Sequence, residues 1–224
     1  MNIDKNIKRY MKDLRPFERY ASFDYCYNYF QSFRENNCIK DIANSKNIEV
    51  SCLQLSLYLA SWGMYRGSTY TLQKSSRFYE QLIKNISKFD EEIWDIDVDD
   101  YNNDSKIGII IQCKEMIHNS FGDWKKATDT LISKIMLGVF GVIPAYDTLF
   151  KKGCRANSIN SNGIKPRSLK ALFKFYSETE NQRKINKWSK NIHTLQFLSG
   201  KETILNYPKA KIIDMIFFIE GKNL

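Results

Sequence analysis

A single lysine interrupts an apolar stretch in the second half of the chain. Lys134 stands among Ile, Met, Leu, Val and Phe residues, and Asp147 follows shortly after Pro144. Because an unpaired ammonium group is costly to bury, this lysine must reach solvent, pair with an acid or take part in chemistry. We predict that Lys134 and Asp147 form a reactive, catalytic pair, either near hydrogen-bonding distance, about 2.7 to 3.5 Å, or just far enough apart for one bound group. The alternative is that Lys134 faces solvent and Asp147 caps a helix.

Other patterns of catalytic or metal-binding residues give no support to an enzyme class. The chain has two histidines, His118 and His193, and neither has the sequence context of a catalytic triad. Its five cysteines include no C-x-x-C pair, so we expect free thiols packed as small apolar groups. No phosphate-binding loop, dinucleotide fingerprint or H-E-x-x-H motif occurs. We therefore expect neither a metal nor a cofactor.

The segment 62–68, which reads WGMYRGS, favours a tight turn that presents an arginine. Gly63 and Gly67 bracket Arg66, and Trp62 and Tyr65 supply aromatic neighbours. We predict that Arg66 lies exposed at this turn beside Trp62, where it can contact an anion. The alternative is a structural arginine that pairs with an acid such as Asp24.

Apolar residues at helical spacing cover most of the chain and predict an all-α or mostly α fold. The predicted helices span residues 16–34, 53–62, 72–86, 105–121, 127–140, 166–176, 188–198 and 212–219. We expect a single helical domain over residues 1–224, with the option of an N-terminal half, 1–156, and a C-terminal subdomain, 164–224. In 16–34 aromatic residues occupy both helix faces, which favours core packing over a base-stacking platform; the apolar stripe comprises Phe17, Tyr20, Phe23, Tyr27 and Phe30.

A short helix is expected just after the apolar segment. Pro144 fits its first turn, which would place Asp147 near the start and Lys151 and Lys152 at the end, where the helix dipole favours cations. With Arg66 and Trp62, these two lysines are our predicted nucleic-acid-binding residues.

The distribution of charge indicates a polyanionic partner. The chain has 34 basic and 25 acidic residues, a net charge of +9, and eight of the acids fall within 90–104. The remaining residues carry a balance of +17, which favours nucleic acid, DNA more than RNA, with binding that weakens as salt rises. We interpret 90–104 as a solvated acidic loop that could dock a basic protein partner.

Membrane insertion and export have no support in the sequence. The apolar windows are shorter than the roughly 20 residues that cross a bilayer, and the first residues lack a signal-peptide pattern. We expect a cytoplasmic protein with no membrane partner.

Two resemblances add to these inferences. A helix bearing Lys134, then a turn, then Pro144 and Asp147, resembles the catalytic end of helix-hairpin-helix DNA glycosylases. The resemblance implies that the lysine attacks the sugar carbon and that the aspartate stabilises the developing positive charge. The segments 62–68 and 138–147 resemble those of a family of uncharacterised bacterial proteins, which implies a bacterial source and supplies no mechanism.

Three functions follow as hypotheses. The first is a basic bacterial protein that binds nucleic acid, in DNA transactions or phage defence. The second is a helix-hairpin-helix-like glycosylase or lyase that uses Lys134 and Asp147. The third is a protein-interaction module that acts through the acidic segment 90–104.

Overall fold

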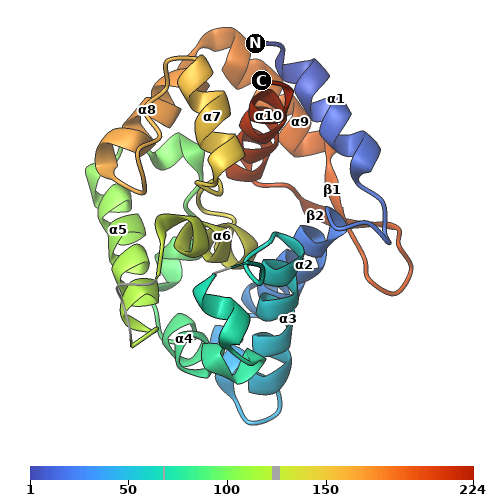
Figure 1. The fold of residues 1–224 in the computed structure, drawn as a ribbon, viewed down its shortest axis with the longest axis vertical. Helices are drawn as coiled ribbons and strands as arrows, with labels where there is room; N and C mark the ends of the chain where they lie inside the picture. Colours follow the sequence, from blue (N-terminus) through green and yellow to red (C-terminus); the bar gives the residue numbers. More distant parts are fainter. Residues whose placement is uncertain (68, 123–126) are drawn as a thin grey trace.

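The computed structural model describes residues 1–67, 69–122 and 127–224, and within them the fold is mostly α, as predicted. These residues form ten α-helices and one two-stranded antiparallel sheet (Figure 1): α1 (Ile3–Asp13), α2 (Ala21–Glu35), α3 (Ile48–Ser61), α4 (Glu80–Ile86), α5 (Asp104–Asn119), α6 (Asp129–Phe140), α7 (Thr148–Ala156), α8 (Pro166–Ser177), α9 (Thr179–Asn191), β1 (His193–Leu195), β2 (Glu202–Asn206) and α10 (Lys209–Asn223). None of the helices described is long and apolar enough to cross a membrane.

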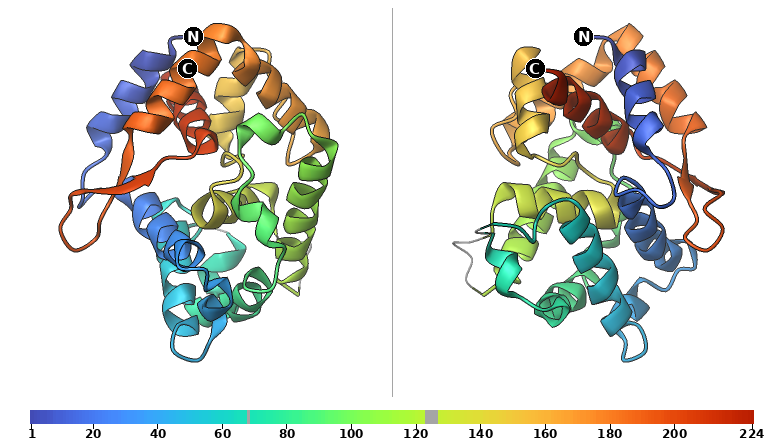
Figure 2. Two further views of the ribbon diagram at one scale, coloured as in Figure 1. Left: turned by 180° about the vertical axis from the view of Figure 1, so that it is seen from behind. Right: turned by 45° about the vertical axis from the view of Figure 1, so that its right-hand side comes forward.

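Helix α6 lies at the centre of the molecule and contacts α2, α3 and α5 (Figures 1 and 2). It is buried on all sides, since every residue from Leu131 to Phe140 is shielded from solvent. The Thr128 side chain caps its start, and the helix ends at Gly141. At Gly138 a Cβ atom would lie 2.4 Å from the ring of Tyr58, so α3 approaches the helix as closely as glycine allows. Gly138 therefore marks a close contact between helices, and Gly141 marks the end of α6.

The C-terminal helix α10 joins the end of the chain to its beginning. It packs against α1 and α7, and the two chain ends lie side by side at the top of Figure 1. Its contact with α7 is a backbone crossing at two glycines. A Cβ atom added to Gly153 would lie 2.1 Å from the Phe217 carbonyl oxygen. A Cβ atom added to Gly221 would lie 1.9 Å from the Leu149 carbonyl oxygen.

Several predicted helix limits in the N-terminal half are wrong. The helix expected from Pro16 starts at Ala21, because residues 14–20 form turns, and Phe17 at the predicted core stripe is fully exposed. The helix expected over 53–62 spans Ile48–Ser61 and buries a different face: Leu53 and Leu57 point outward, at 40% and 64% exposure.

Two further predictions fail after the centre of the chain. Residues 142–147 are not helical, and 142–146 are buried, so Pro144 does not open a helix, and α7 starts at Thr148. Lys151 and Lys152 therefore lie inside α7, and its last turn carries Arg155 instead. The helix expected over 188–198 ends at Asn191, and the rest forms the hairpin of β1 and β2.

The acidic segment 90–104 is folded into the molecule and is not a free loop. It forms the 3₁₀ helices η4 (Glu91–Trp94) and η5 (Val98–Asp100). Asp97 accepts hydrogen bonds from the backbone N–H groups of Lys209 and Ala210, at 2.7 and 2.9 Å, and so caps the start of α10. Further acids form ion pairs with cations from other elements: Glu92 with Lys106, Asp95 with Arg34, Asp99 with Lys209 and Asp104 with Lys170. Asp90, Glu91 and Asp100 form no ion pair among the described residues, and Asp90 and Glu91 are exposed.

The α7–α10 crossing predicts a large effect for one methyl group. We expect Gly221→Ala to lower the free energy of unfolding by about 2 kcal/mol or more, since its Cβ would overlap a backbone oxygen that cannot rotate away. The control is Gly108→Ala in α5, where no atom lies within 4 Å of the added Cβ. That variant should keep or gain stability, by up to about 1 kcal/mol, in urea denaturation. Equal effects of the two substitutions would contradict the close crossing.

Candidate functional site

Lys134 and Asp147 meet in the core, where α6, α7 and the end of α3 come together. Lys134 is 5% exposed, and its Nζ lies 3.7 Å from Asp147 Oδ2 and donates a hydrogen bond of 2.7 Å to the Trp62 carbonyl oxygen. The other oxygen of Asp147 accepts from the Phe150 backbone N–H at 2.9 Å and caps α7. Asp147 is therefore both a helix cap and the partner of Lys134. The alternative prediction, that Lys134 faces solvent, is wrong.

A second buried ion pair lies beside the first. In α10, Lys211 Nζ lies 2.9 Å from Asp214 Oδ2, and both side chains are almost fully buried. The ammonium group also faces the rings of Tyr10, Phe23 and Trp62, with 4.9, 4.6 and 5.3 Å between Nζ and the ring centroids. Such cation–π contacts gain strength away from water. The sequence signal was a Lys and an Asp three residues apart in the apolar C-terminal run, which our predictions did not use.

A cavity of about 10 Å³ separates the two ion pairs. Its walls combine the four charged side chains with aromatic and aliphatic groups: Tyr58, Trp62, Lys134, Leu137, Ala145, Asp147, Lys211, Asp214 and Phe218. That volume holds about one water molecule, which needs the polar partners that this wall supplies. No sugar or base fits without movement of the surrounding side chains.

Burial shifts the protonation equilibria of this cluster. Burial lowers the pKa of the Lys134 amine. The carboxylates of Asp147 and Asp214 raise that pKa, and the cations Arg66 and Arg19 lower it further. Burial likewise raises the pKa of Asp214, against the opposing effect of Lys211. A desolvated amine next to other cations loses its proton more easily, which makes it a better nucleophile.

Arg66 is exposed at a turn after α3, as the sequence predicts. Gly63 and Gly67 have φ angles of +77° and +58°, which favour glycine and let the chain reverse direction. The Arg66 guanidinium folds back over Gly63, so a Cβ there would lie 2.9 Å from Arg66 Nε. Ser68, the last residue of segment 62–68, lies outside the described residues.

The alternative partner proposed for Arg66, Asp24, is used elsewhere. Asp24 is fully buried and accepts hydrogen bonds from the Tyr207 hydroxyl and from the Leu195 backbone N–H, the latter at 2.9 Å. Burial raises the pKa of Asp24 to about 7, while these hydrogen bonds and Lys211 lower it. Asp24 therefore anchors β1 and Tyr207, two residues before α10, to helix α2.

Trp62 connects the buried cluster to the surface. Its ring stacks on Tyr20 with 5.4 Å between centroids, and the Arg19 guanidinium lies 5.2 Å from the Trp62 ring. Lys151 and Lys152, the other predicted binding residues, lie on α7 and do not line the cavity. The structure thus places Trp62, Lys134 and Asp147 together around the cavity, with Arg66 nearby. Lys151 and Lys152 are not part of this group.

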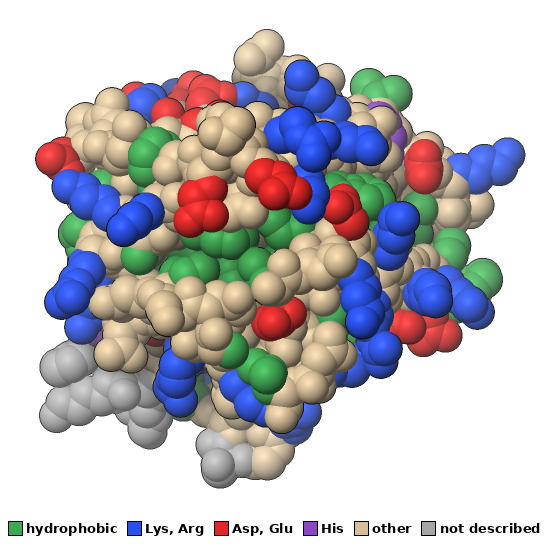
Figure 3. Space-filling view, turned by 90° about the horizontal axis from the view of Figure 1, so that it is seen from above, with side chains coloured by type: hydrophobic (Ala, Val, Ile, Leu, Met, Phe, Trp, Pro, Cys, Tyr) green, Lys and Arg blue, Asp and Glu red, His purple; other side chains and the backbone are tan. Residues whose placement is uncertain are grey.

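The sequence analysis missed a row of cations at the start of the chain, here called the basic strip. It follows the exposed face of α1 and the turn after it, and it comprises Lys5, Lys8, Arg9, Lys12, Arg15 and Arg19. Among the described residues none of the six forms an ion pair. Of the nearby acids, Asp4 and Asp13 pair with Lys184 and Lys222, and Glu18 lies in the turn between Arg15 and Arg19. Figure 3 shows groups of Lys and Arg side chains on its right-hand side, the side of α1 in Figure 1. The signal available in the sequence was the spacing of the cations at helical positions.

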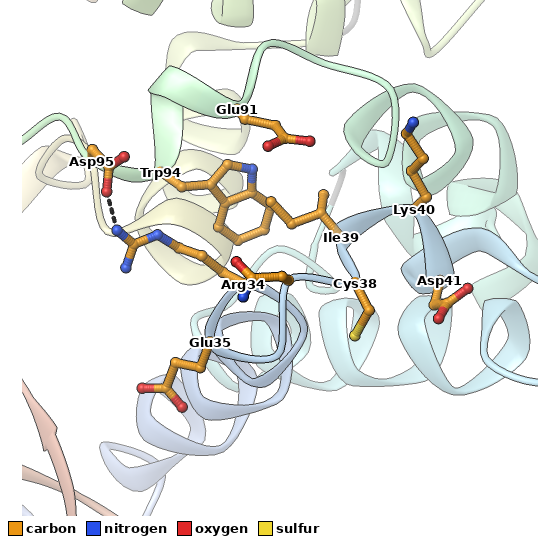
Figure 4. Close-up of a pocket in the computed structure, with 10 residues that line it drawn as sticks. Arg34, Glu35, Cys38, Ile39, Lys40, Asp41, Glu91, Trp94 and Asp95 are labelled. Carbon is orange, nitrogen blue, oxygen red and sulfur yellow. Dashed lines mark hydrogen bonds and ion pairs between the residues drawn. The ribbon is translucent and has the colours of Figure 1, made fainter.

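A larger cavity of about 600 Å³ opens between the end of α2, the 3₁₀ helix η1 (Ile39–Ala43) and η4. Figure 4 shows Trp94 forming one wall and the ion pair of Arg34 with Asp95 at one edge. Its charged side chains are four acids and two cations: Glu35, Asp41, Glu91, Asp95, Arg34 and Lys40. This excess of carboxylates disfavours a polyanion, so we do not place nucleic acid there.

The raised pKa of Asp24 predicts a pH dependence of stability. A carboxyl group whose pKa rises from 3.8 to about 7 on folding binds a proton more tightly in the folded state, so stability is lost as pH rises from about 4 to 7. We expect Asp24→Asn to remove this contribution. Thermal melts of both proteins across that range measure this. As pH rises, the Tm of the wild type should fall relative to the Tm of the variant. A difference that is constant with pH would contradict the assignment.

Comparison of the chain with models of protein families, with curated proteins and with solved structures gave no match. The function must therefore be inferred from the charges, burial and geometry described above.

Proposed function

We propose that the protein binds nucleic acid through the basic strip. The observation that carries this proposal is that six exposed cations follow one another along α1 and its turn, without an ion-pair partner in the described part of the chain. Unpaired surface cations attract phosphates and release counterions on binding.

The geometry of the strip suits a phosphate backbone. Lys5, Lys8, Arg9 and Lys12 recur at three- and four-residue spacing on α1, so they share one face of a helix about 16 Å long. Arg15 and Arg19 extend the row toward Trp62. Arg66, at its exposed turn after α3, is a further cation close enough to the buried cluster to lower the pKa of Lys134. Phosphate contacts of this kind position a nucleic acid without reading its sequence.

The salt dependence of binding tests the basic strip. Affinity for a labelled oligonucleotide should fall steeply between about 50 and 200 mM salt. For Lys8→Gln/Lys12→Gln we expect the slope of log K against log salt to decrease by about two, one for each phosphate that a lysine no longer neutralises. Fluorescence anisotropy over a salt series measures both quantities.

A control of equal charge is available on other elements. Lys46 and Lys174 are exposed and form no ion pair among the described residues, in a loop and in α8 respectively. Lys46→Gln/Lys174→Gln should keep the wild-type slope. If both double variants lower the slope equally, binding follows the net charge of the protein and the strip is not the site.

A second candidate function uses the buried pair. The observation that favours it is that Lys134, with its lowered pKa, lies 3.7 Å from Asp147 at the wall of a cavity. The resemblance to helix-hairpin-helix DNA glycosylases assigns a nucleophilic lysine and an aspartate to these two positions. Since the cavity holds about one water molecule, a sugar could reach Lys134 only if side chains that line the cavity moved away.

Borohydride trapping tests this lyase activity. A neutral amine that adds to the C1′ aldehyde of an abasic site forms a carbinolamine, which loses water to give a Schiff base. Hydride from borohydride reduces this Schiff base to a stable protein–DNA adduct. We expect an adduct with DNA that carries an abasic site, and we expect its loss in Lys134→Met. In Lys151→Met, which removes an amine outside the cavity, the adduct should remain. The absence of any adduct in the wild type, or its survival in Lys134→Met, would rule out this function.

A further inference from the structure

The β1–β2 hairpin carries large apolar side chains into solvent. Phe197 and Leu198, in the loop between the strands, are 73% and 90% exposed, and Phe17 in the turn before α2 is fully exposed. Single exposed apolar residues are ordinary, but three large ones on adjacent loops form a patch that calls for a partner. Phe17, Phe197 and Leu198 are here called the apolar tip.

The two loops of the apolar tip contact each other. A Cβ atom on Gly200 would lie 2.9 Å from Pro16 Cγ, and Tyr25 donates a hydrogen bond of 2.7 Å to the Pro16 carbonyl oxygen. The Tyr25 ring also meets the Phe197 ring edge to face, with 5.1 Å between centroids. Figures 1 and 2 show the hairpin loop projecting from the body of the molecule beside the chain that leaves α1.

The hairpin is held in place by α2. Leu195 donates its backbone N–H to Asp24, and its carbonyl oxygen accepts from the Asn28 side chain at 2.8 Å. The loop is closed by a backbone hydrogen bond of 2.7 Å from Gln196 to Lys201 and by a hydroxyl contact of 2.6 Å between Thr194 and Thr203. The exposed rings are therefore presented on a fixed support, which lowers the entropic cost of binding.

The charges around the apolar tip favour one class of partner. Arg15 and Arg19 flank Phe17, and Lys201 follows the hairpin loop; all three are exposed, and the nearby acids are Glu18 and Glu202. The tip also continues the basic strip directly, because Arg15 precedes Pro16. Rings and aliphatic groups surrounded by cations match a ligand with flat apolar faces and negative charges, which is the chemistry of nucleobases on a phosphate backbone.

We propose, on the basis of the proposed nucleic-acid binding, that the apolar tip stacks against unpaired bases. The basic strip holds the phosphates, and Phe17, Phe197 and Leu198 contact base faces that a regular duplex keeps covered. The preferred ligand is therefore single-stranded or locally unpaired nucleic acid. Aromatic stacking of this kind tolerates any base, since every base offers a π face.

The experiment compares single-stranded and duplex oligonucleotides of about 20 nucleotides, with 2-aminopurine in the single strand to report stacking. Wild-type protein should bind the single strand more tightly and change its 2-aminopurine fluorescence. Phe197→Ala/Leu198→Ala should weaken single-strand binding by about tenfold or more, as expected when one or two bases no longer stack, and should abolish the fluorescence change. Its affinity for duplex should stay within about twofold of wild type, because the cations that bind phosphate remain.

Leu53→Ala/Leu57→Ala is the matched control, since it removes two exposed leucines from α3. It should behave as wild type with both ligands. If the wild type binds duplex and single strand equally, or if the tip variant equals the control, stacking is wrong while the basic strip stands. If the wild type binds neither ligand, the proposed function itself fails. A tip variant that loses only self-association, measured by analytical ultracentrifugation, would assign the hairpin to a second copy of the chain and overturn the proposal.

Discussion

The burial of two ammonium groups is the constraint on which the rest of the structure depends. A charged amine in the core is tolerated only when its desolvation is offset by an opposite charge and by hydrogen bonds. Lys134 has Asp147 and the Trp62 carbonyl oxygen, and Lys211 has Asp214 and three aromatic rings. These partners come from α3, α7 and α10 and from the aromatic residues of α1 and α2. Their positions are thereby fixed relative to the central helix α6.

The same polar groups satisfy backbone atoms that regular structure leaves without partners. The Trp62 carbonyl oxygen lies at the end of α3, where the last carbonyls of a helix lack intrahelical donors, and Lys134 supplies one. The buried segment 142–146 forms no helix or strand that could use its backbone N–H groups. Asp214 accepts from Ala145, at 3.1 Å, and Ser133 accepts from Tyr146, at 2.8 Å. The polar cluster therefore makes a non-helical segment compatible with burial.

The functional proposals use the surface that surrounds this rigid centre. Trp62 contacts both the buried centre and the surface. Its ring packs between Tyr20 and Phe218, and it also faces the exposed cation Arg19 and the buried cation Lys211. The basic strip and the apolar tip extend from this point along α1 and the hairpin. Phosphate binding on the strip and base stacking at the tip are physically separate contributions. Each can be removed by substitutions that leave the buried ion pairs intact.

Helical spacing and the cost of burying charge allowed much of the fold and one part of the site to be predicted. The spacing identified α6, α8 and α10, and the isolated Lys134 pointed to Asp147 because a buried amine needs a partner. The start of α2 was missed because the Pro16 signal belongs to a turn, and the Pro144 signal failed because side chains such as Asp214 replace helical hydrogen bonds there. The hairpin reads as a helix in the sequence, since its strands are only three and five residues long.

Features made by distant segments could not be predicted in this way. The ion pairs of 90–104 join it to Arg34, Lys170 and Lys209, and no local pattern reports such contacts. The cavity beside Trp94 has the same origin, because its walls come from 34–41 and 91–95. The aromatic cage around Lys211 likewise combines side chains from α1, α2 and the end of α3.

A double-mutant cycle on Lys134 and Asp147 tests the central claim most directly. Lys134→Met keeps the length of the side chain without the charge, and Asp147→Asn keeps an oxygen to cap α7. If the buried pair holds α6 against α7, each single variant should lose stability, and the double variant should lose less than their sum. The account predicts a coupling of about 0.5 to 3 kcal/mol in the free energy of unfolding. Additive losses, with no coupling, would show that the two charges do not depend on each other and would contradict it.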